Sequence, residues 1–360
     1  MEYIRPIKNI LLFTLFFLLL GVSSTCTGDL THVYREPGTG NQEEEIRNLN
    51  DDSLSTYEEY RDEPDTYQYS QEDEPISSTR KNWVPGITSL SNLTPEQKKT
   101  IASLKKTPIN QEILSATPPI TVPEDLPESF DWRDNDGDWT TPIKDQGEEC
   151  GSCWAHAAIG VLEAHWKIIN QDPSIVIDLS EQYLISCDSD DDGCEGGDFE
   201  TAMPYLVNTP GPDGITGTVD EENYPYTEEQ EACMDLSKFT RYKTDKWAYV
   251  NATAEEDPEL SIPSVEELKA AIYLKGPIAV GVQDDDDFDD YTEGIFYSDI
   301  QYPETNHAVI LVGWGVEDEE EFFIGKNSVG TQWGEDGWFR IDVYSNRIGE
   351  GAVYLDRTDT

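Results

Sequence analysis

The sequence predicts an α+β fold for the C-terminal two thirds of its 360 residues. Helical patterns come first there, because apolar residues recur at three- to four-residue spacing from Ser152 to about Ile169 and within Val265–Leu274. Short apolar runs bounded by Gly, Asp and Asn follow, which is typical of β-strands. These runs are PIAVGV, HAVILVGWG, EFFIGKN and GWFRIDVY. Eight of the nine tryptophans lie after residue 125, so this block can bury a large core.

A secretory signal peptide is predicted for residues 1–25. Arg5 and Lys8 precede the apolar run Ile10–Val22, and small serines follow it. The run is too short for a comfortable membrane span, so we expect the processed protein to be secreted or to stay at the cell surface without entering the membrane. Cys26 comes next and is interpreted as an ordinary residue, the alternative being a lipid-bearing cysteine.

Residues 26–80 are predicted to be an acidic, disordered segment. They carry 15 acidic and 4 basic residues and almost no aliphatic pattern. Such a segment cannot bury enough apolar surface to offset the entropy lost on ordering.

Residues 81–125 are interpreted as a pro-segment and linker that is removed near Leu126. A short amphipathic helix is expected within Leu93–Lys106, with Thr94 as its N-cap and Pro95 at its first position. A proline-rich stretch then leads into the following domain.

The net charge of −50 limits the partners that this protein can have. From Leu126 onward there are 54 acidic and 13 basic residues, so the excess is not confined to a tail. Self-repulsion destabilises a compact state in dilute buffer, and about 1 M salt largely screens it. We therefore expect adaptation to a salt-rich habitat, and neither nucleic acid nor an anionic membrane as a partner.

Two cysteines three residues apart, Cys150 and Cys153, lie in the stretch DQGEECGSCWAHAA. A zinc site would need a second pair of ligands, and a thioredoxin-like motif would need a preceding strand; neither pattern is present. The block from Leu126 holds five cysteines, so in an oxidising compartment one thiol stays free. Cys153 is the candidate, because the first turn of a helix favours a thiolate; a buried, inert cysteine is the alternative.

A thiolate nucleophile needs a histidine partner, and the chain has four. His32 lies in the segment predicted to be disordered, while His156 and His165 share the helix of Cys153 and are interpreted as packing or surface residues. His307 opens the run HAVILVGWG and is the remaining candidate.

A series of motifs, in order along the chain, resembles the papain-like cysteine peptidases. They are LPESFDWRD, QGEECGSCWA, LSEQYLISC, GCEGG, YPY, GPIAV, NHAVILVGWG and KNSVGTQWGEDGWFRI. The resemblance implies a peptidase domain over residues 126–360, with a helical lobe, an antiparallel β-barrel-like lobe and an active-site cleft between them. It also implies peptide or protein substrates, no cofactor or metal, a monomer, and a precursor form.

The same resemblance implies four catalytic roles. Cys153 attacks the peptide carbonyl as a thiolate, and His307 is its ion-pair partner and the acid for the leaving amine. Asn327 orients the imidazole, and Gln146 donates to the developing oxyanion together with the backbone N–H of Cys153.

Binding residues and disulfides follow from the resemblance as well. Gly196 and Gly197 pair with an extended substrate strand, and Trp333 forms the aromatic wall on the leaving-group side. The residues expected to line the main specificity pocket are Asp198, Phe199, Gly281, Asn306 and Ala308. The implied disulfides are Cys150–Cys194 and Cys187–Cys233.

Three departures from the family pattern stand out. One additional acidic residue lies between Gln146 and Cys153, which could misaim Gln146. Val329 replaces a tryptophan that shields the Asn–His hydrogen bond, so we expect that bond to be wetter and weaker. His156 stands where an aromatic residue is common, and we expect it to pack. A catalytically silent peptide-binding homologue and an amide-forming transferase are the alternatives to an endopeptidase.

Two further features of the sequence are weaker indications of a calcium site and of glycosylation. The acidic stretches Asp188–Gly193 and Asp284–Asp290 lack the spacing of a calcium loop and are interpreted as solvated loops. Asn92 and Asn251 fit the glycosylation sequon, which is only permissive.

Overall fold

The computed structural model describes residues 82–107, 113, 117–250 and 262–356. All of them fall in one compact unit. The predicted signal peptide, the acidic segment with Cys26, and Asn251 lie outside the described residues. Over the described ranges, no helix has both the length and the apolar character needed to cross a membrane.

The helices begin where their capping residues predict. Ser152 is the N-cap of α3, which starts at Cys153. Ser264 caps α6 through a capping box, and Thr94 caps α1 in the same way with Pro95 at its first position. The helices are α1 (Pro95–Ile101), α3 (Cys153–Ile169), α4 (Gln182–Cys187), α5 (Phe199–Val207), α6 (Val265–Lys275) and α7 (Asp286–Asp289), with 3₁₀ turns η1 (Trp132–Asp134), η2 (Gly193–Glu195) and η3 (Glu221–Asn223).

The strands form one mixed sheet in the order β1-β5-β8-β7-β6-β4-β9-β3, with β2 paired to β6. Neighbours are antiparallel except for the parallel pair β5 and β8. The four apolar runs of the sequence became β4, β6, β7 and β8. The strands are β1 (Trp83–Pro85), β2 (Phe130–Asp131), β3 (Lys246–Tyr249), β4 (Ile278–Val282), β5 (Tyr291–Phe296), β6 (His307–Glu317), β7 (Glu320–Lys326), β8 (Trp338–Asp342) and β9 (Glu350–Asp356).

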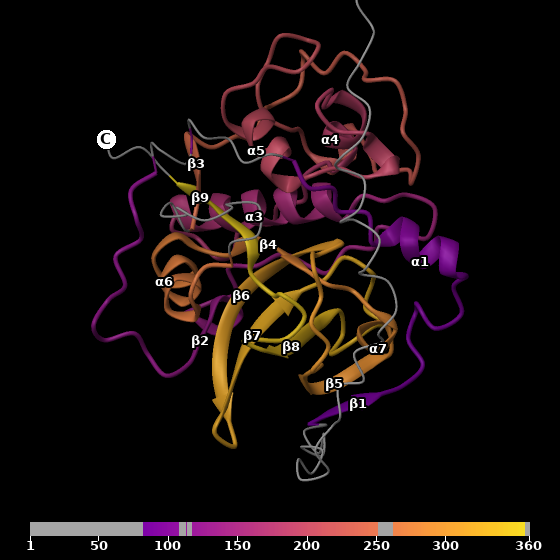
Figure 1. The fold of residues 1–360 in the computed structure, drawn as a ribbon. Coiled ribbons are helices and arrows are strands. Elements are labelled where there is room, and N and C mark those ends of the chain that lie inside the picture. The colour runs from indigo at the N-terminus through magenta and orange to yellow at the C-terminus, as the bar shows by residue number, and fades with distance from the viewer. Residues whose placement is uncertain (1–81, 108–112, 114–116, 251–261, 357–360) are drawn as a thin grey trace, which may run out of the picture. The chain divides into compact units, whose positions relative to one another are not determined.

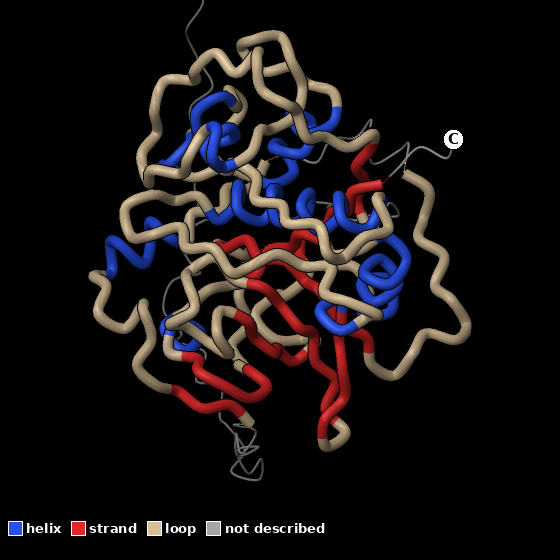
Figure 2. Tube along the Cα trace, turned by 180° about the vertical axis from the view of Figure 1, so that it is seen from behind, coloured by secondary structure: helices blue, strands red, loops and turns tan. Residues whose placement is uncertain are grey.

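Helix α3 separates the two parts of the fold (Figure 1). Helices α4 and α5 and their loops lie on one side of it, and the sheet lies on the other, as the view from behind also shows (Figure 2). Most of α3 is buried, and it contacts both β6 and α5. This arrangement confirms the predicted α+β architecture, with Cys153 on the helix and His307 on the facing sheet.

The segment before residue 108 packs along the β part and then crosses to the helical part. Strand β1 pairs antiparallel with β5, and the ring of Trp83 lies 4.9 Å from that of Phe296. Leu90 and Ile101 are buried in the common core. Helix α1 ends at Ile101, five residues before the predicted limit, because the chain beyond it is extended and its backbone bonds to Asn306 and Gly197.

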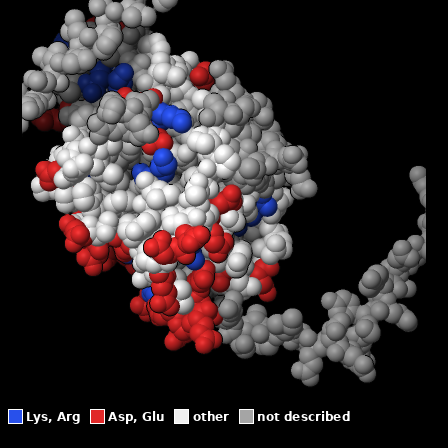
Figure 3. Space-filling model, turned by 90° about the vertical axis from the view of Figure 1, so that its left-hand side faces the viewer, with Lys and Arg blue, Asp and Glu red and all other residues white. Residues whose placement is uncertain are grey.

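The surface carries the acidic excess that the sequence predicts. On the face drawn in Figure 3, Asp and Glu side chains gather towards the lower end, with few Lys or Arg side chains among them.

Candidate active site

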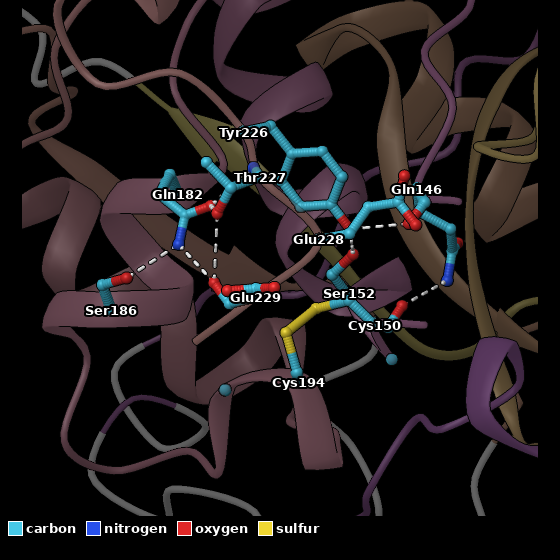
Figure 4. The surroundings of a disulfide bond; sticks show 12 residues. Gln146, Cys150, Ser152, Gln182, Ser186, Cys194, Tyr226, Thr227, Glu228 and Glu229 are labelled. Atoms are coloured by element: carbon cyan, nitrogen blue, oxygen red, sulfur yellow. Dashed lines mark hydrogen bonds between the residues drawn. A yellow bond between two sulfur atoms is a disulfide. The ribbon is translucent and has the colours of Figure 1, made fainter. Parts of the chain in front are cut away.

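Cys153 is the one free cysteine among the described residues. It is fully buried at the first position of α3. The structure joins Cys150 to Cys194 and Cys187 to Cys233, the pairing that the resemblance implies. The first of these disulfides fixes the chain just before α3 (Figure 4).

His307 is the first residue of β6, and Asn327 follows the last residue of β7. The antiparallel pairing of these strands brings the two together: His307 Nε2 donates to Asn327 Oδ1 at 2.8 Å. The backbone N–H of Ser328 donates to the same oxygen at 2.8 Å, which fixes the amide orientation. The other imidazole nitrogen, Nδ1, is left for the thiol of Cys153.

The surroundings of His307 favour its protonated form. Burial is the largest single influence and lowers the pKa of His307. Hydrogen bonding and charge from Cys153, the bond to Asn327 and the charge of Asp289 outweigh burial, so the pKa is raised above its ordinary value of 6.5. This is the electrostatic balance that a thiolate–imidazolium pair requires.

Gln146 is buried next to this pair in spite of the additional residue before Cys153. The exposed Glu148 and Glu149 take up the extra length in a bulge that begins at Gly147, whose φ is +71°. The Gln146 Oε1 atom accepts from the Ser328 hydroxyl at 2.7 Å. Its Nε2 atom therefore points away from Ser328 and donates to the carbonyl of Ile101 at 3.2 Å.

Tyr226 holds the same loop from the other side. Its hydroxyl donates to the Gln146 carbonyl at 2.6 Å and shares a 2.7 Å hydrogen bond with the Ser152 hydroxyl (Figure 4). His156 packs edge-on against the Tyr226 ring, and its Nδ1 donates to the Ser152 carbonyl at 3.0 Å. Burial lowers the pKa of His156 to about 3, so it is a neutral packing residue.

Residues 101–107 of the preceding segment occupy the site. Beyond Ile101, the backbone N–H of Leu104 donates to the Asn306 carbonyl and that of Lys105 to the Gly197 carbonyl, both at 2.8 Å. A parallel bridge joins Leu104 to Gly197. Gly197, expected to pair with a substrate strand, thus pairs here with residues of the chain's own N-terminal part.

Glycine is needed at 196 because of this close approach, and at 197 because the ring of Trp154 lies against it. A Cβ on Gly196 would lie 2.3 Å from the Ser103 carbonyl oxygen, and the φ of Gly196 is +105°. A Cβ on Gly197 would lie 2.6 Å from the ring of Trp154. The two glycines therefore let an extended chain lie against the helical part.

The pocket next to Gly197 differs in part from the one expected from the sequence. Asp198 and Phe199 line it, and Gly281 lies against its lining, since a Cβ there would lie 2.5 Å from Thr305 Oγ1; Asn306 and Ala308 are not part of the lining. The Asn306 side chain instead makes hydrogen bonds with the backbone of Asp284. Ala308 lines a different, small cavity, whose other lining residues come in part from helix α3.

Other residues that sequence reasoning missed complete this pocket. They are Glu200, Thr305, Glu350 and Gly351. Glu350 comes next to Gly281 only through the pairing of β4 with β9. No local pattern in the sequence signals a pairing between strands so far apart.

Val329 and Trp333 lie behind the His307–Asn327 pair. The expectation that Val329 leaves this hydrogen bond wet is wrong for this form of the chain, since His307 is fully buried and Asn327 is 4% exposed. The segment before residue 108 lies here: the Ser89 hydroxyl donates to the Val329 carbonyl at 3.1 Å. Trp333 is fully buried, and its Nε1 donates to the Phe288 carbonyl.

A buried charge network under α3 was also missed. Glu163, on α3 and fully buried, accepts from Thr141 at 2.5 Å and from the Leu179 backbone at 2.8 Å. It pairs with Lys144 at 2.9 Å. Lys326, the neighbour of Asn327, donates to the Thr141 hydroxyl at 2.9 Å. The network ties α3 to the strand that ends beside Asn327.

The interpretation of both acidic stretches as solvated loops holds only in part: Asp190, Asp192, Asp286 and Asp287 are exposed, but each stretch also has a buried carboxylate. Asp188 and Asp289 are 5% and 4% exposed. Burial and the nearby Asp191 raise the pKa of Asp188 to about 8. Asp191 accepts from the backbone N–H of Asp198 and the hydroxyl of Thr201, so it braces the start of α5. Over the ranges described, no group of three or more metal-ligating side chains that could hold an ion was found.

Comparison with known proteins identifies the family. Residues 126–354 match the model of the papain family cysteine protease. The chain belongs to this family.

Similar papain family proteases come from several sources. The chain is 35% identical over 264 residues to a viral cathepsin of Adoxophyes honmai nucleopolyhedrovirus, covering 73% of this chain and 70% of that protein. It is 37% identical over 225 residues to a viral cathepsin of Heliothis zea nuclear polyhedrosis virus, covering 62% of this chain and 54% of that one. The chain thus spans little more than half the length of some relatives that it matches.

A solved structure of a precursor is similar as well. The digestive procathepsin L2 proteinase from Tenebrio molitor larval midgut superposes with a TM-score of 0.63 at 29% identity, covering 76% of this chain and 84% of that chain.

Proposed function

We propose that this papain family protease is a secreted cysteine endopeptidase that is made as a zymogen. The observation that carries the proposal is the position of His307, which lies between the free Cys153 and the orienting Asn327 and has a raised pKa. We propose peptide substrates because the chain belongs to a family of proteases.

The reaction uses these residues in two steps. The Cys153 sulfur forms a bond to the peptide carbonyl carbon, while Gln146 Nε2 and the Cys153 backbone N–H hold the oxyanion. As the C–N bond breaks, His307 gives its proton to the leaving amine, and a thioester remains. His307 then takes a proton from water, whose oxygen bonds to the thioester carbonyl carbon; the C–S bond breaks, the acid product leaves, and Cys153 is restored as a thiolate beside the protonated His307.

The zymogen proposal is supported by what fills the cleft. The Ile101 carbonyl accepts the hydrogen bond from Gln146 that an oxyanion would accept. Leu104 and Lys105 use the carbonyls of Asn306 and Gly197. The parallel bridge to Gly197 gives the pro-segment a fixed strand direction in the cleft. Inhibition by the pro-segment, secretion and salt adaptation are parts of the same proposal.

Peptide hydrolysis tests the central part. The full-length chain is converted to the processed enzyme by limited proteolysis and assayed with a fluorogenic peptide. We expect hydrolysis that is lost in Cys153→Ala and in His307→Ala, while Cys26→Ala keeps full activity. Unchanged hydrolysis by Cys153→Ala would reject the proposal, and ligation of added amines would favour a transferase.

A further inference from the structure

The two oxyanion donors of the proposed reaction come from different parts of the chain, with an exposed bulge between them. Gln146 lies before the bulge, and the backbone N–H of Cys153 lies after it at the start of α3. Glu148 and Glu149 within the bulge are exposed. In the unprocessed chain the Ile101 carbonyl also holds Gln146 Nε2, but this partner leaves with the pro-segment. In the processed enzyme, the spacing of the two donors therefore depends on what holds the two ends of the bulge.

The hydroxyl of Tyr226 contacts both ends of the bulge. It lies 2.6 Å from the Gln146 carbonyl oxygen and 2.7 Å from the Ser152 hydroxyl oxygen (Figure 4). Ser152 directly precedes Cys153 and is the N-cap residue of α3. A single oxygen atom thus joins the residue that carries one oxyanion donor to the neighbour of the residue that carries the other.

The directions of these hydrogen bonds follow from the hydrogens that are available. A backbone carbonyl can only accept, so Tyr226 gives its hydrogen to Gln146, and its oxygen then accepts from the Ser152 hydroxyl. Burial lowers the pKa of His156 to about 3, so its ring is neutral and carries one hydrogen. That hydrogen is on Nδ1, which lies 3.0 Å from the Ser152 carbonyl oxygen and 3.3 Å from the Ser152 hydroxyl oxygen. The chain of hydrogen bonds therefore runs in one direction, from His156 to Gln146, and its members strengthen one another.

The loop that carries Tyr226 is fixed to the helical part of the fold by Gln182, a buried residue at the start of α4. Gln182 Oε1 accepts from the Thr227 backbone N–H at 3.0 Å, and Gln182 Nε2 donates to the Glu229 carbonyl at 2.8 Å (Figure 4). The Tyr226 backbone N–H donates to Glu221 Oε1 at 2.7 Å. The hydroxyl of Tyr226 is therefore held at a fixed place beside the bulge.

The same loop also holds the bulge at the additional residue. Glu228 Oε2 accepts from the Glu148 backbone N–H at 3.1 Å. A Cβ at position 147 would clash with the Glu228 carboxylate, so Gly147 is needed for this contact. Glu228 has a φ of +57°, a conformation that a residue other than glycine keeps only where its surroundings hold it. Two departures from the family pattern, the longer bulge and His156, thus meet at the loop of Tyr226.

We propose that Tyr226 is a positioning residue that holds the two oxyanion donors at the spacing that the reaction needs, and that His156 completes the hydrogen-bond chain that fixes its hydroxyl. The inference rests on the proposed peptidase function. Both residues act through Gln146 and Ser152 and do not act on the substrate directly.

The test compares Tyr226→Phe with Tyr224→Phe, each in the processed enzyme. Tyr226→Phe keeps the ring that packs against His156 and removes only the hydroxyl. Tyr224 is a matched control, because it is buried two residues earlier and its hydroxyl donates to the Ala232 carbonyl. We expect kcat for a fluorogenic peptide to fall on the order of tenfold in Tyr226→Phe, with KM nearly unchanged, and to stay at the wild-type value in Tyr224→Phe.

Two inhibitors separate a positioning role from general damage to the fold. With a peptide aldehyde, the Cys153 sulfur bonds to the aldehyde carbon, the carbon–oxygen double bond becomes single, and the oxygen takes up the proton that the thiol gives up. That oxygen lies between the oxyanion donors. With iodoacetamide, the sulfur displaces iodide and no oxyanion forms. We expect Ki of the aldehyde to rise on the order of tenfold in Tyr226→Phe, while the alkylation rate and its pH dependence stay unchanged.

The hydrogen-bond chain is tested with two further variants, which also serve if Tyr226→Phe does not fold. Ser152→Ala removes the middle hydroxyl, which makes no capping hydrogen bond to α3. His156→Phe keeps an aromatic ring and removes the donor. We expect both to lower kcat and raise Ki of the aldehyde without changing the alkylation rate. Because Ser152 and Tyr226 act as one unit, the double variant should lower kcat no further than the more damaging single variant.

The outcomes separate the two proposals. A wild-type kcat in Tyr226→Phe, a rise in Ki matched by an equal fall in the alkylation rate, or additive losses in the double variant would overturn the role of Tyr226 alone. A wild-type kcat in His156→Phe would overturn the role of His156. Absence of hydrolysis by the wild-type processed enzyme would overturn the proposed function and this inference with it.

Discussion

At the residue scale, the site depends on which atom each side chain presents. Cys153, His307 and Asn327 could be predicted from the sequence because each lies in a distinctive motif. The contacts of Ser328 and Tyr226 with Gln146 could not be predicted, because they join residues that lie far apart in the sequence. The side chain of Gln146 is aimed by these neighbours rather than by its own loop.

Gln146→Ala is predicted to lower kcat by on the order of 100- to 1000-fold, because one oxyanion donor is lost. Ser328→Ala should lower kcat by less and leave KM nearly unchanged, since Gln146 keeps its amide but loses the 2.7 Å bond that orients it. Steady-state kinetics of the processed variants measure both effects. A Gln146→Ala enzyme with wild-type kcat would show that the bulge has misaimed this residue.

The pH profile follows from His307. Its raised pKa keeps the imidazole protonated above pH 6.5, where an ordinary histidine loses its proton. The ion pair is therefore present at pH 6.5 and is lost as the pH rises through the raised pKa. Cys153 and Asn327, which raise the pKa, remain after processing. We expect the alkaline limb of kcat/KM above pH 6.5; a limb at or below 6.5 would contradict the assignment.

At the element scale, the sequence predicted the elements that carry a strong local pattern. The start of α1 follows from its capping residue, α3 and α6 follow from the spacing of their apolar residues, and four apolar runs form four of the strands. Strand β9 was not predicted from the sequence. The position of Glu350 could not be predicted either, because β9 joins the sheet through long-range pairing with β4 and β3. Pairing between distant strands leaves no period in the sequence.

Helix α3 is held to its surroundings by the buried charges around Glu163. Glu163→Ala removes one of the three carboxylate partners of Lys144 and the acceptor of the Thr141 hydroxyl, and it takes a compensating negative charge away from the buried Lys326. We expect the free energy of unfolding to fall by about 3–5 kcal/mol. Glu163→Gln keeps the size and shape of the side chain, so we expect a smaller loss in the free energy of unfolding. Urea unfolding of the two variants measures the difference, and equal stability of Glu163→Ala and wild type would show that the network is not stabilising.

At the scale of the whole molecule, we expect the acidic excess to make stability depend on salt. The segment from Leu126 holds 54 acidic and only 13 basic residues. Repulsion between these charges opposes folding in dilute buffer, and raising the salt to about 1 M shortens the screening length to about 3 Å. We expect Tm to rise steadily with KCl. A Tm that is the same in low and high salt would reject salt adaptation.

The proposed function depends on one reactive thiol, that of Cys153, which lies where the helical and sheet parts meet. The pro-segment covers this thiol before processing. The direct measurement is labelling of the chain with a peptidyl epoxide before and after processing, with mass spectrometry to locate the label. We predict no label on Cys153 before processing, and afterwards one label per chain on Cys153 that abolishes hydrolysis. A label at another cysteine, or hydrolysis that continues once Cys153 is fully labelled, would contradict the account.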